Sequence, residues 1–142
     1  MSNENYSIST DTSKMDVTLI HDYLCNDSYW AKGRSMSLVK RSMENSICFG
    51  LFFQDGTQVG FARVVTDKVV FAWVMDVFVV KSHQGKGLGR ALLDYISCHP
   101  DIKTVNGIGL RTNDARQFYR KFGFNTIENP KTWLFKKNTP CE

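Results

Sequence analysis

An apolar run from Val69 to Val80 constrains the fold of this chain more than any other feature of the sequence. It is too short to cross a membrane as a helix, which needs about 20 apolar residues. A strand that is apolar on both faces belongs in the centre of a sheet whose faces are both covered. A glycine-rich stretch, a helical pattern and a second apolar run, Val105 to Arg111, come next in the chain. This order predicts a β-α-β unit with the glycine-rich loop at its first turn.

The other predicted elements follow from hydrophobic period, caps and turns. Asp55-Gly56 is a strong hairpin signal between two predicted strands. The full predicted order is β-α-α-β-β-β-α-β-α-β, in which the first strand has no defined ends. This order predicts a mixed sheet with helices on both faces. The predicted helices are Lys14–Leu24, Ser35–Asn45, Gly87–Cys98 and Asn113–Phe122, and the further predicted strands are Ile47–Phe53, Val59–Thr66 and Lys131–Lys136.

The length and composition predict one globular domain over residues 1–142. Hydrophobic residues make up 42% of the chain and charged residues 23%, which excludes a disordered protein. The net charge is +4, but the cations are scattered and the longest block is Lys136-Lys137. This scatter argues against a nucleic-acid partner. The polar residues from Met1 to Thr10 lack the apolar core of a signal peptide.

Four cysteines, Cys25, Cys48, Cys98 and Cys141, lie far apart, with no CxxC motif and no histidine at metal-ligand spacing. Such spacing is typical of reduced thiols in a reducing compartment rather than of disulfides or a zinc site. We therefore predict a cytoplasmic protein with no metal and no membrane partner. The three histidines are expected at the surface; they are His21, His83 and His99.

The stretch from Gln84 to Arg90, with sequence QGKGLGR, is the sharpest functional signal. Closely spaced glycines let the backbone approach a ligand without a Cβ atom in the way. Amide N–H groups at the start of a helix are unpaired and partially positive, so the loop suits a phosphate or pyrophosphate. It is not a P-loop, because Gly87 follows Lys86, and its GxGxG spacing departs from the GxGxxG dinucleotide motif. A tight strand-to-helix turn with no ligand is the structural alternative.

At this loop the sequence resembles the GNAT acetyltransferase superfamily. Gln84 to Gly89 matches the [QR]-x-x-G-x-[GA] loop that holds the coenzyme A pyrophosphate in that family. Met75 to Val80 is similar to the strand that leads into this loop. Ala115 to Phe124 is similar to the family's A-x-x-F-Y-x-K-x-G-F segment, and the order of elements matches over nearly the whole chain.

The resemblance implies a GNAT-like α/β (α+β) fold, whose mixed central sheet has about six to seven strands splayed at the acetyl-CoA site. Coenzyme A would enter where the first strand of the β-α-β unit separates from the second. Backbone groups near Phe78 and Val79 would bond to the pantetheine arm and polarise the thioester carbonyl. Thr112 stands where the family usually has Asn, so it or Asn113 would cap the next helix or contact coenzyme A. The pyrophosphate would lie against the amides of Gln84, Gly85, Lys86, Gly87, Leu88, Gly89 and Arg90.

Two residues are predicted to carry the chemistry of acetyl transfer. Tyr119 is the candidate general acid, because a phenol is protonated at neutral pH and can donate to the departing thiolate. Its alternative role is that of a core aromatic residue with a satisfied hydroxyl group. Asp76 interrupts an apolar strand, where burial would favour proton acceptance near neutral pH, and is the candidate base. Its alternative role is to satisfy backbone amides at a bulge.

The acceptor pocket is predicted from one polar, aromatic loop and two strands. Tyr29 and Trp30 would stack on a substrate, and Arg34 or Arg63 would hold a carboxylate. Trp73 would add a further wall. The alternative is that the aromatic side chains cover the sheet and the cations are solvated.

These features predict an enzyme, an N-acetyltransferase that moves the acetyl group of acetyl-CoA directly to a primary amine of a small molecule in a ternary complex. An alternative of a different class is a non-catalytic module that binds acyl-CoA as a sensor. Acetyl-CoA is the expected cosubstrate. The acceptor stays open among aminoglycosides, polyamines, amino acids and protein termini, and so does a homodimer formed through an exposed strand.

Overall fold

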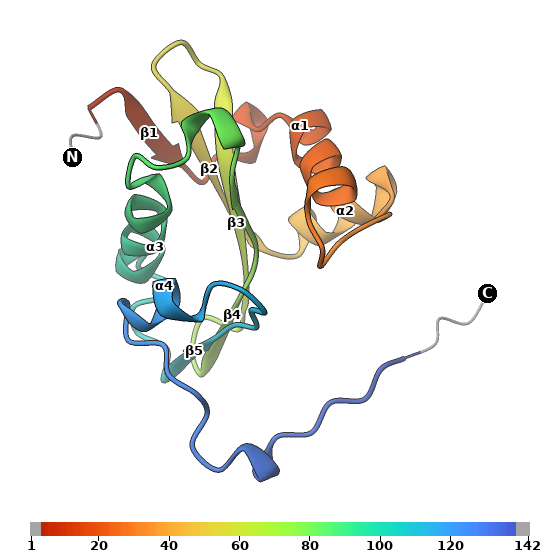
Figure 1. The fold of residues 1–142 in the computed structure, drawn as a ribbon, viewed down its shortest axis with the longest axis vertical. Coiled ribbons are helices and arrows are strands. Elements are labelled where there is room, and N and C mark those ends of the chain that lie inside the picture. The colour runs from red at the N-terminus through yellow and green to blue at the C-terminus, as the bar shows by residue number, and fades with distance from the viewer. Residues whose placement is uncertain (1–3, 139–142) are drawn as a thin grey trace. The chain divides into compact units, whose positions relative to one another are not determined.

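The computed structural model describes residues 4–138, which form two compact units that divide after Arg111. Figure 1 shows the sheet of the first unit, with α1 and α2 on one face and α3 on the other. Within residues 4–138, no helix is both long enough and apolar enough to cross a membrane.

The first unit is built on a five-stranded mixed sheet in which the strands lie in sequence order. Each neighbouring pair is antiparallel except the last, which is parallel. The mixed α/β fold with helices on both faces is thus confirmed, although the described residues supply five strands rather than six or seven. The strands are β1 (Tyr6–Ser9), β2 (Ile47–Phe53), β3 (Gln58–Thr66), β4 (Phe71–Val79) and β5 (Gly107–Gly109).

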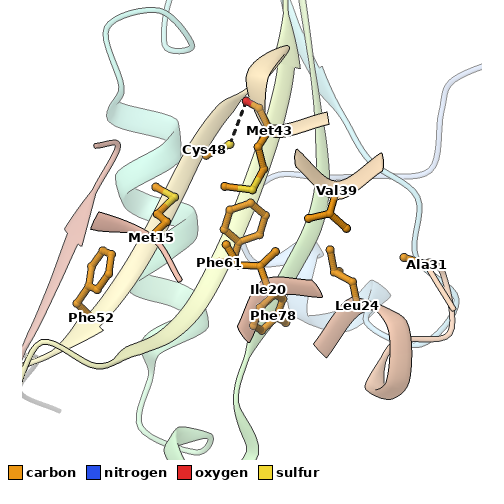
Figure 2. Close-up of a cluster of buried hydrophobic side chains, with 10 residues drawn as sticks. All are labelled: Met15, Ile20, Leu24, Ala31, Val39, Met43, Cys48, Phe52, Phe61 and Phe78. Atoms are coloured by element: carbon orange, nitrogen blue, oxygen red, sulfur yellow. Dashed lines mark hydrogen bonds between the residues drawn. The ribbon is translucent and has the colours of Figure 1, made fainter. Parts of the chain in front are cut away.

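One face of the sheet is covered by α1 (Val17–Asp22) and α2 (Met36–Glu44). Ser35 begins α2 by accepting a hydrogen bond from the Leu38 amide, as expected for a helix cap. Figure 2 shows the core on this side, where side chains from both helices meet those of the strands. The buried residues of this core are Met15, Ile20, Leu24, Ala31, Val39, Met43, Cys48, Phe52, Phe61 and Phe78.

The opposite face is covered by α3 (Leu88–Cys98), the helix of the β-α-β unit. Its apolar side packs on the three central strands, β2, β3 and β4, because apolar residues recur at helical spacing along it. The buried residues of this second core are Phe49, Ala62, Val64, Ala72, Val74, Leu92, Ile96 and Ile102.

The predicted single helix Lys14–Leu24 is wrong, because the segment is divided into three short pieces. A 3-10 turn, Thr12–Lys14, comes first, and Asp16 then starts α1 by accepting a hydrogen bond from the Leu19 amide. The Asp16 amide donates to Gln58 Oε1 on β3 at 2.6 Å, which fixes this start against the sheet. After α1 the chain widens into a π-helix, Tyr23–Asp27, where the sequence predicted a loop from residue 26.

The second unit contains α4 (Arg116–Arg120) and a 3-10 turn, Pro130–Thr132. The predicted strand Lys131–Lys136 is wrong. Asn129 adopts a left-handed conformation before Pro130, and the Trp133 amide closes the turn by donating to the Pro130 carbonyl at 3.1 Å. Residues 133–138 form no strand ladder, and a strand is stabilised only when its backbone groups pair with a neighbouring strand.

Phe61 provides the test of the core. It is fully buried among residues of β2, β4 and the helical layer, so truncation to alanine leaves a cavity. We expect Phe61→Ala to lower the free energy of unfolding by about 3–5 kcal/mol in denaturant titrations. The control Phe135→Ala removes the same atoms from a side chain that is 79% exposed. It should change the unfolding free energy by no more than about 0.5 kcal/mol, and equal losses in the two variants would contradict the assigned core.

Candidate active site

A β-bulge in β4 shapes the centre of the candidate site. Two residues of β4, Asp76 and Val77, lie opposite the single residue Ala62 of β3, and Asp76 has a left-handed φ of 55°. The extra residue reverses the alternation of the strand. Val74 therefore packs on the α3 side, whereas Phe78 packs on the α1 and α2 side, although both positions are even-numbered. Aspartate tolerates this backbone conformation better than most residues.

The edge of β4 that faces β5 is open beyond the bulge. The parallel pairing of β4 with β5 ends at Trp73 and Gly109, and in the described part of the chain no strand pairs with that edge from Val74 onward. The Val80 amide donates toward β3, to Val59 O at 2.8 Å. Because backbone groups alternate in direction along a strand, those of Val79 turn to the open edge. The ring of Phe78 stacks on that of Tyr23, with the ring centroids 4.0 Å apart, so Phe78 contributes packing rather than backbone groups at the open edge.

The glycine-rich loop has the backbone conformation that its sequence predicts. Gly85 and Gly87 have φ values of 79° and 76°, in the left-handed region that favours glycine. Gly87 is the N-cap of α3 and makes no side-chain cap bond, so no side chain at the cap occupies the amides of the first turn. Lys86 is exposed, and the Leu88 side chain is buried beneath the loop. The helix start is therefore a positive, sterically open cradle for an anion.

Two contacts fix the start of this loop. The side chain of Gln84 donates to the Val79 carbonyl at 2.8 Å, which connects the loop to the open edge of β4. His83 lies one residue earlier, and its Nδ1 is 2.8 Å from the hydroxyl group of Tyr6 on β1. The expectation that the three histidines are surface residues is wrong, because His21, His83 and His99 are all half-buried. The ring of His83 lies between those of Tyr6 and Phe53.

Asp76 is the centre of a polar cluster on the α1 and α2 side of the sheet, here called the Asp76 cluster: Trp30, Arg34, Arg63 and Asp76. The carboxylate is 1% exposed. Its Oδ1 accepts from Trp30 Nε1 at 3.1 Å, and its Oδ2 accepts from Arg34 at 2.7 Å and from Arg63 Nε at 2.9 Å. Four of the residues predicted from the sequence are therefore in direct contact.

Arg63 is the more deeply held of the two arginines, with a side chain 8% exposed. Besides Asp76, it donates to Ser46 Oγ at 3.1 Å and contacts Met75 Sδ at 3.3 Å. Sequence reasoning missed Ser46 and Met75. The strand pairing could have identified Ser46. In the register of β2 and β3, Arg63 lies opposite Cys48, which is two residues after Ser46.

The other predicted wall residues divide into two groups. Tyr29 packs edge-on against Trp30, with ring centroids 5.1 Å apart, so it belongs beside the Asp76 cluster. Trp73 does not join them. Its ring lies near Phe71 at 6.1 Å and over Gly109, where a Cβ atom would come within 2.7 Å of the indole.

The buried thiol beside the cluster is not a nucleophile. Burial raises the pKa of Cys48 to about 11, so its thiol stays protonated at neutral pH. Cys25 and Cys48 are free thiols, as is Cys98; Cys141 lies outside the described residues. Residues 4–138 contain no group of three or more metal-ligating side chains placed to hold a metal ion.

The predicted general acid and the predicted cap residues lie in the second unit. Tyr119 is half-buried on α4, with its ring edge-on to Phe118 at 5.1 Å and to Phe124 at 5.9 Å. Thr112 accepts a hydrogen bond from the Ala115 amide at 3.0 Å. The prediction that Thr112 or Asn113 caps the helix is wrong, because α4 begins only at Arg116 and its N-cap residue is Ala115, without a side-chain cap bond.

Comparison with known proteins identifies the family. The model of the Acetyltransferase (GNAT) domain matches residues 45–126, more than half of the chain, and the match extends over both units. A crystal structure of a GNAT-family protein from Xanthomonas campestris pv. campestris is 41% identical, with a TM-score of 0.90, and the match covers 95% of this chain and 94% of that one. The chain belongs to the GNAT acetyltransferase family.

Curated relatives share part of this similarity. An Uncharacterized N-acetyltransferase ycf52 of Gracilaria tenuistipitata var. liui is 31% identical over 114 residues, which cover 75% of this chain and 62% of that protein. Serotonin N-acetyltransferase 2, chloroplastic, of Oryza sativa subsp. japonica is 41% identical over 70 residues, which cover 49% of this chain and 35% of that protein. This chain spans a little under two thirds of the length of the first curated relatives that it matches.

The glycine loop offers a matched pair of variants. Gly85 and Gly56 both have positive φ and open space where a Cβ atom would stand, but Gly56 lies in the hairpin between β2 and β3. We expect Gly85→Ala and Gly56→Ala each to lower stability by about 1–2 kcal/mol. Only Gly85→Ala should weaken coenzyme A binding, by about tenfold or more in calorimetry, because strain there displaces the amides of the cradle. An equal loss of binding in Gly56→Ala would show that the loop has no special role.

Proposed function

We propose that this protein is an N-acetyltransferase that transfers the acetyl group of acetyl-CoA directly to a primary amine of a small molecule, within a ternary complex. The observation that carries the proposal is the junction of two features: an open β4 edge beyond the bulge and a glycine-rich cradle at the start of α3. The Gln84 side chain connects them through the Val79 carbonyl. A ligand with a diphosphate and an amide-containing arm matches both.

The reaction needs a nucleophilic attack and two proton movements. The neutral amine attacks the thioester carbonyl carbon, the C–S bond breaks, and the amide bond forms while the nitrogen loses a proton. We propose that the Val79 backbone forms hydrogen bonds with the pantetheine arm and that the loop amides hold the diphosphate. Tyr119 donates its hydroxyl proton to the departing thiolate, as the match of its segment to the family suggests.

The contacts of Asp76 do not support its predicted role as the base. Both carboxylate oxygens already accept hydrogen bonds, and the side chain is almost fully buried. A base must reach the proton that it accepts directly or through one water molecule. We propose instead that the amine loses its proton to solvent.

The acceptor is proposed to bind beside Tyr29 and Trp30, which are 49% and 41% exposed next to the Asp76 cluster. Their exposed rings offer an apolar surface for stacking. The partial match to a relative named for serotonin fits an acceptor with an aromatic or apolar body. We therefore choose tryptamine and serotonin as first probe amines, together with L-tryptophan and spermine to represent amino acids and polyamines.

The proposal is tested by binding and by turnover on the same preparation. We expect calorimetry to detect coenzyme A binding, and acetyl-CoA with a suitable amine to release free thiol in proportion to acetylated amine. Binding without thiol release across the amines would instead fit the acyl-CoA sensor. No heat with coenzyme A in folded protein would contradict both.

Tyr119→Phe tests the proposed acid. We expect kcat to fall by about tenfold or more, because the thiolate leaves without a positioned proton, while acetyl-CoA binding stays the same. Tyr95→Phe makes the same change on α3, at an exposed side chain, and should leave kcat unaltered. Full turnover in the Tyr119 variant would remove this residue from the mechanism.

A further inference from the structure

The Asp76 cluster holds more positive than negative charge. Two guanidinium groups share one carboxylate, which leaves one uncompensated positive charge on largely buried side chains. Among residues 4–138 no other carboxylate lies within ion-pair distance of Arg34 or Arg63. Burying an uncompensated charge is costly, so the arrangement favours binding of an anionic group.

The two arginines differ in their capacity to bind such a group. Arg63 uses all three of its nitrogens on Asp76, Ser46 and Met75. Arg34 uses only one nitrogen, on Asp76, and its side chain is 20% exposed. Its remaining donors have no protein partner among the described residues and reach solvent. A guanidinium edge in this state matches the two oxygens of a carboxylate.

The position of Arg34 connects this charge to the proposed acceptor site. Trp30 and Arg34 belong to one loop, and both donate to the same carboxylate. The partly exposed rings of Tyr29 and Trp30 therefore belong to the same loop as Arg34, and Trp30 and Arg34 meet at one carboxylate. An apolar surface beside a fixed guanidinium fits a small molecule with an apolar body and a carboxylate.

We propose that Arg34 binds the carboxylate of the acceptor, which is a small amine that also carries a carboxylate, such as an amino acid. Asp76 is then a positioning residue that holds Arg34 and Trp30 against the bulge. This inference rests on the proposed acetyl transfer for its substrate, and it names the class of amine that the site selects.

Arg34→Gln is the decisive variant, because it leaves Asp76 and Arg63 as a balanced ion pair and so preserves the core. Thiol release is measured with two matched pairs, L-tryptophan with tryptamine and L-leucine with 3-methylbutylamine. We expect the wild-type protein to prefer the carboxylated member by about tenfold or more in kcat/KM. Arg34→Gln should lose that preference, because KM rises by about tenfold or more for the carboxylated member relative to its decarboxylated partner. Arg41→Gln, at an exposed arginine of α2, is the control and should keep the preference.

Asp76→Asn separates positioning from base catalysis. Asparagine tolerates the left-handed backbone but carries no charge to hold Arg34. We expect a raised KM for the carboxylated amine, an unchanged pH profile of kcat, and faster hydrogen exchange of the amides of residues 28–34. Loss of the acidic limb of the pH profile, where the rate rises as a base loses its proton, with unaltered KM would make Asp76 a base and overturn its positioning role. The matched control is Asp94→Asn, at an exposed aspartate of α3.

Calorimetry of the same amine pairs, with coenzyme A present, measures the preference without turnover. Equal effects of Arg34→Gln on both members of each pair would overturn the carboxylate site, as would a wild-type preference for the decarboxylated amine in binding and turnover. Thiol release confined to the decarboxylated amines would overturn it while leaving the proposed acetyl transfer intact. Failure of coenzyme A to bind would instead contradict the proposed acetyl transfer.

Discussion

The ion pairs at the β4 bulge are the interaction on which the rest of the site depends. Asp76 takes a left-handed conformation in the middle of a central strand, and its carboxylate accepts from two arginines and a tryptophan. The bulge reverses the strand's alternation, so that even-numbered Val74 packs on the α3 side before it and even-numbered Phe78 packs on the α1 and α2 side after it. One extra residue in β4 therefore determines which of its side chains enter each core of the first unit, and it lies at the centre of the polar cluster.

The same strand connects the two halves of the proposed reaction. Asp76 orders the loop of Trp30 and Arg34, where the acceptor is proposed to bind. Three residues later, Val79 turns its backbone to the open edge and accepts from Gln84 at the start of the glycine-rich loop. Because β4 is a central strand held by β3 along its length, these groups are placed with little freedom. Geometry of this kind favours catalysis by positioning.

Parts of the fold were predictable because short stretches of sequence determine them. Strand Ile47–Phe53 has the predicted ends, and the ends of α2 and α3 lie within a residue of those predicted. Helix Lys14–Leu24 was wrong because Asp16 caps a later start that is fixed by Gln58 on a distant strand. Sequence could single out Asp76 as unusual in an apolar strand, but it could not show that donors already occupy its oxygens.

The sequence by itself determined the glycine-rich loop, the β-α-β unit and the family resemblance, because glycine φ preferences, helix caps and hydrophobic period act over a few neighbouring residues. Tertiary structure alone decided the partners of Asp76. Arg34 lies 42 positions away in the sequence and Arg63 lies 13 away. Their meeting depends on strand register, on the bulge and on the layer that covers the sheet, and these are set by packing of the whole unit rather than by any local pattern.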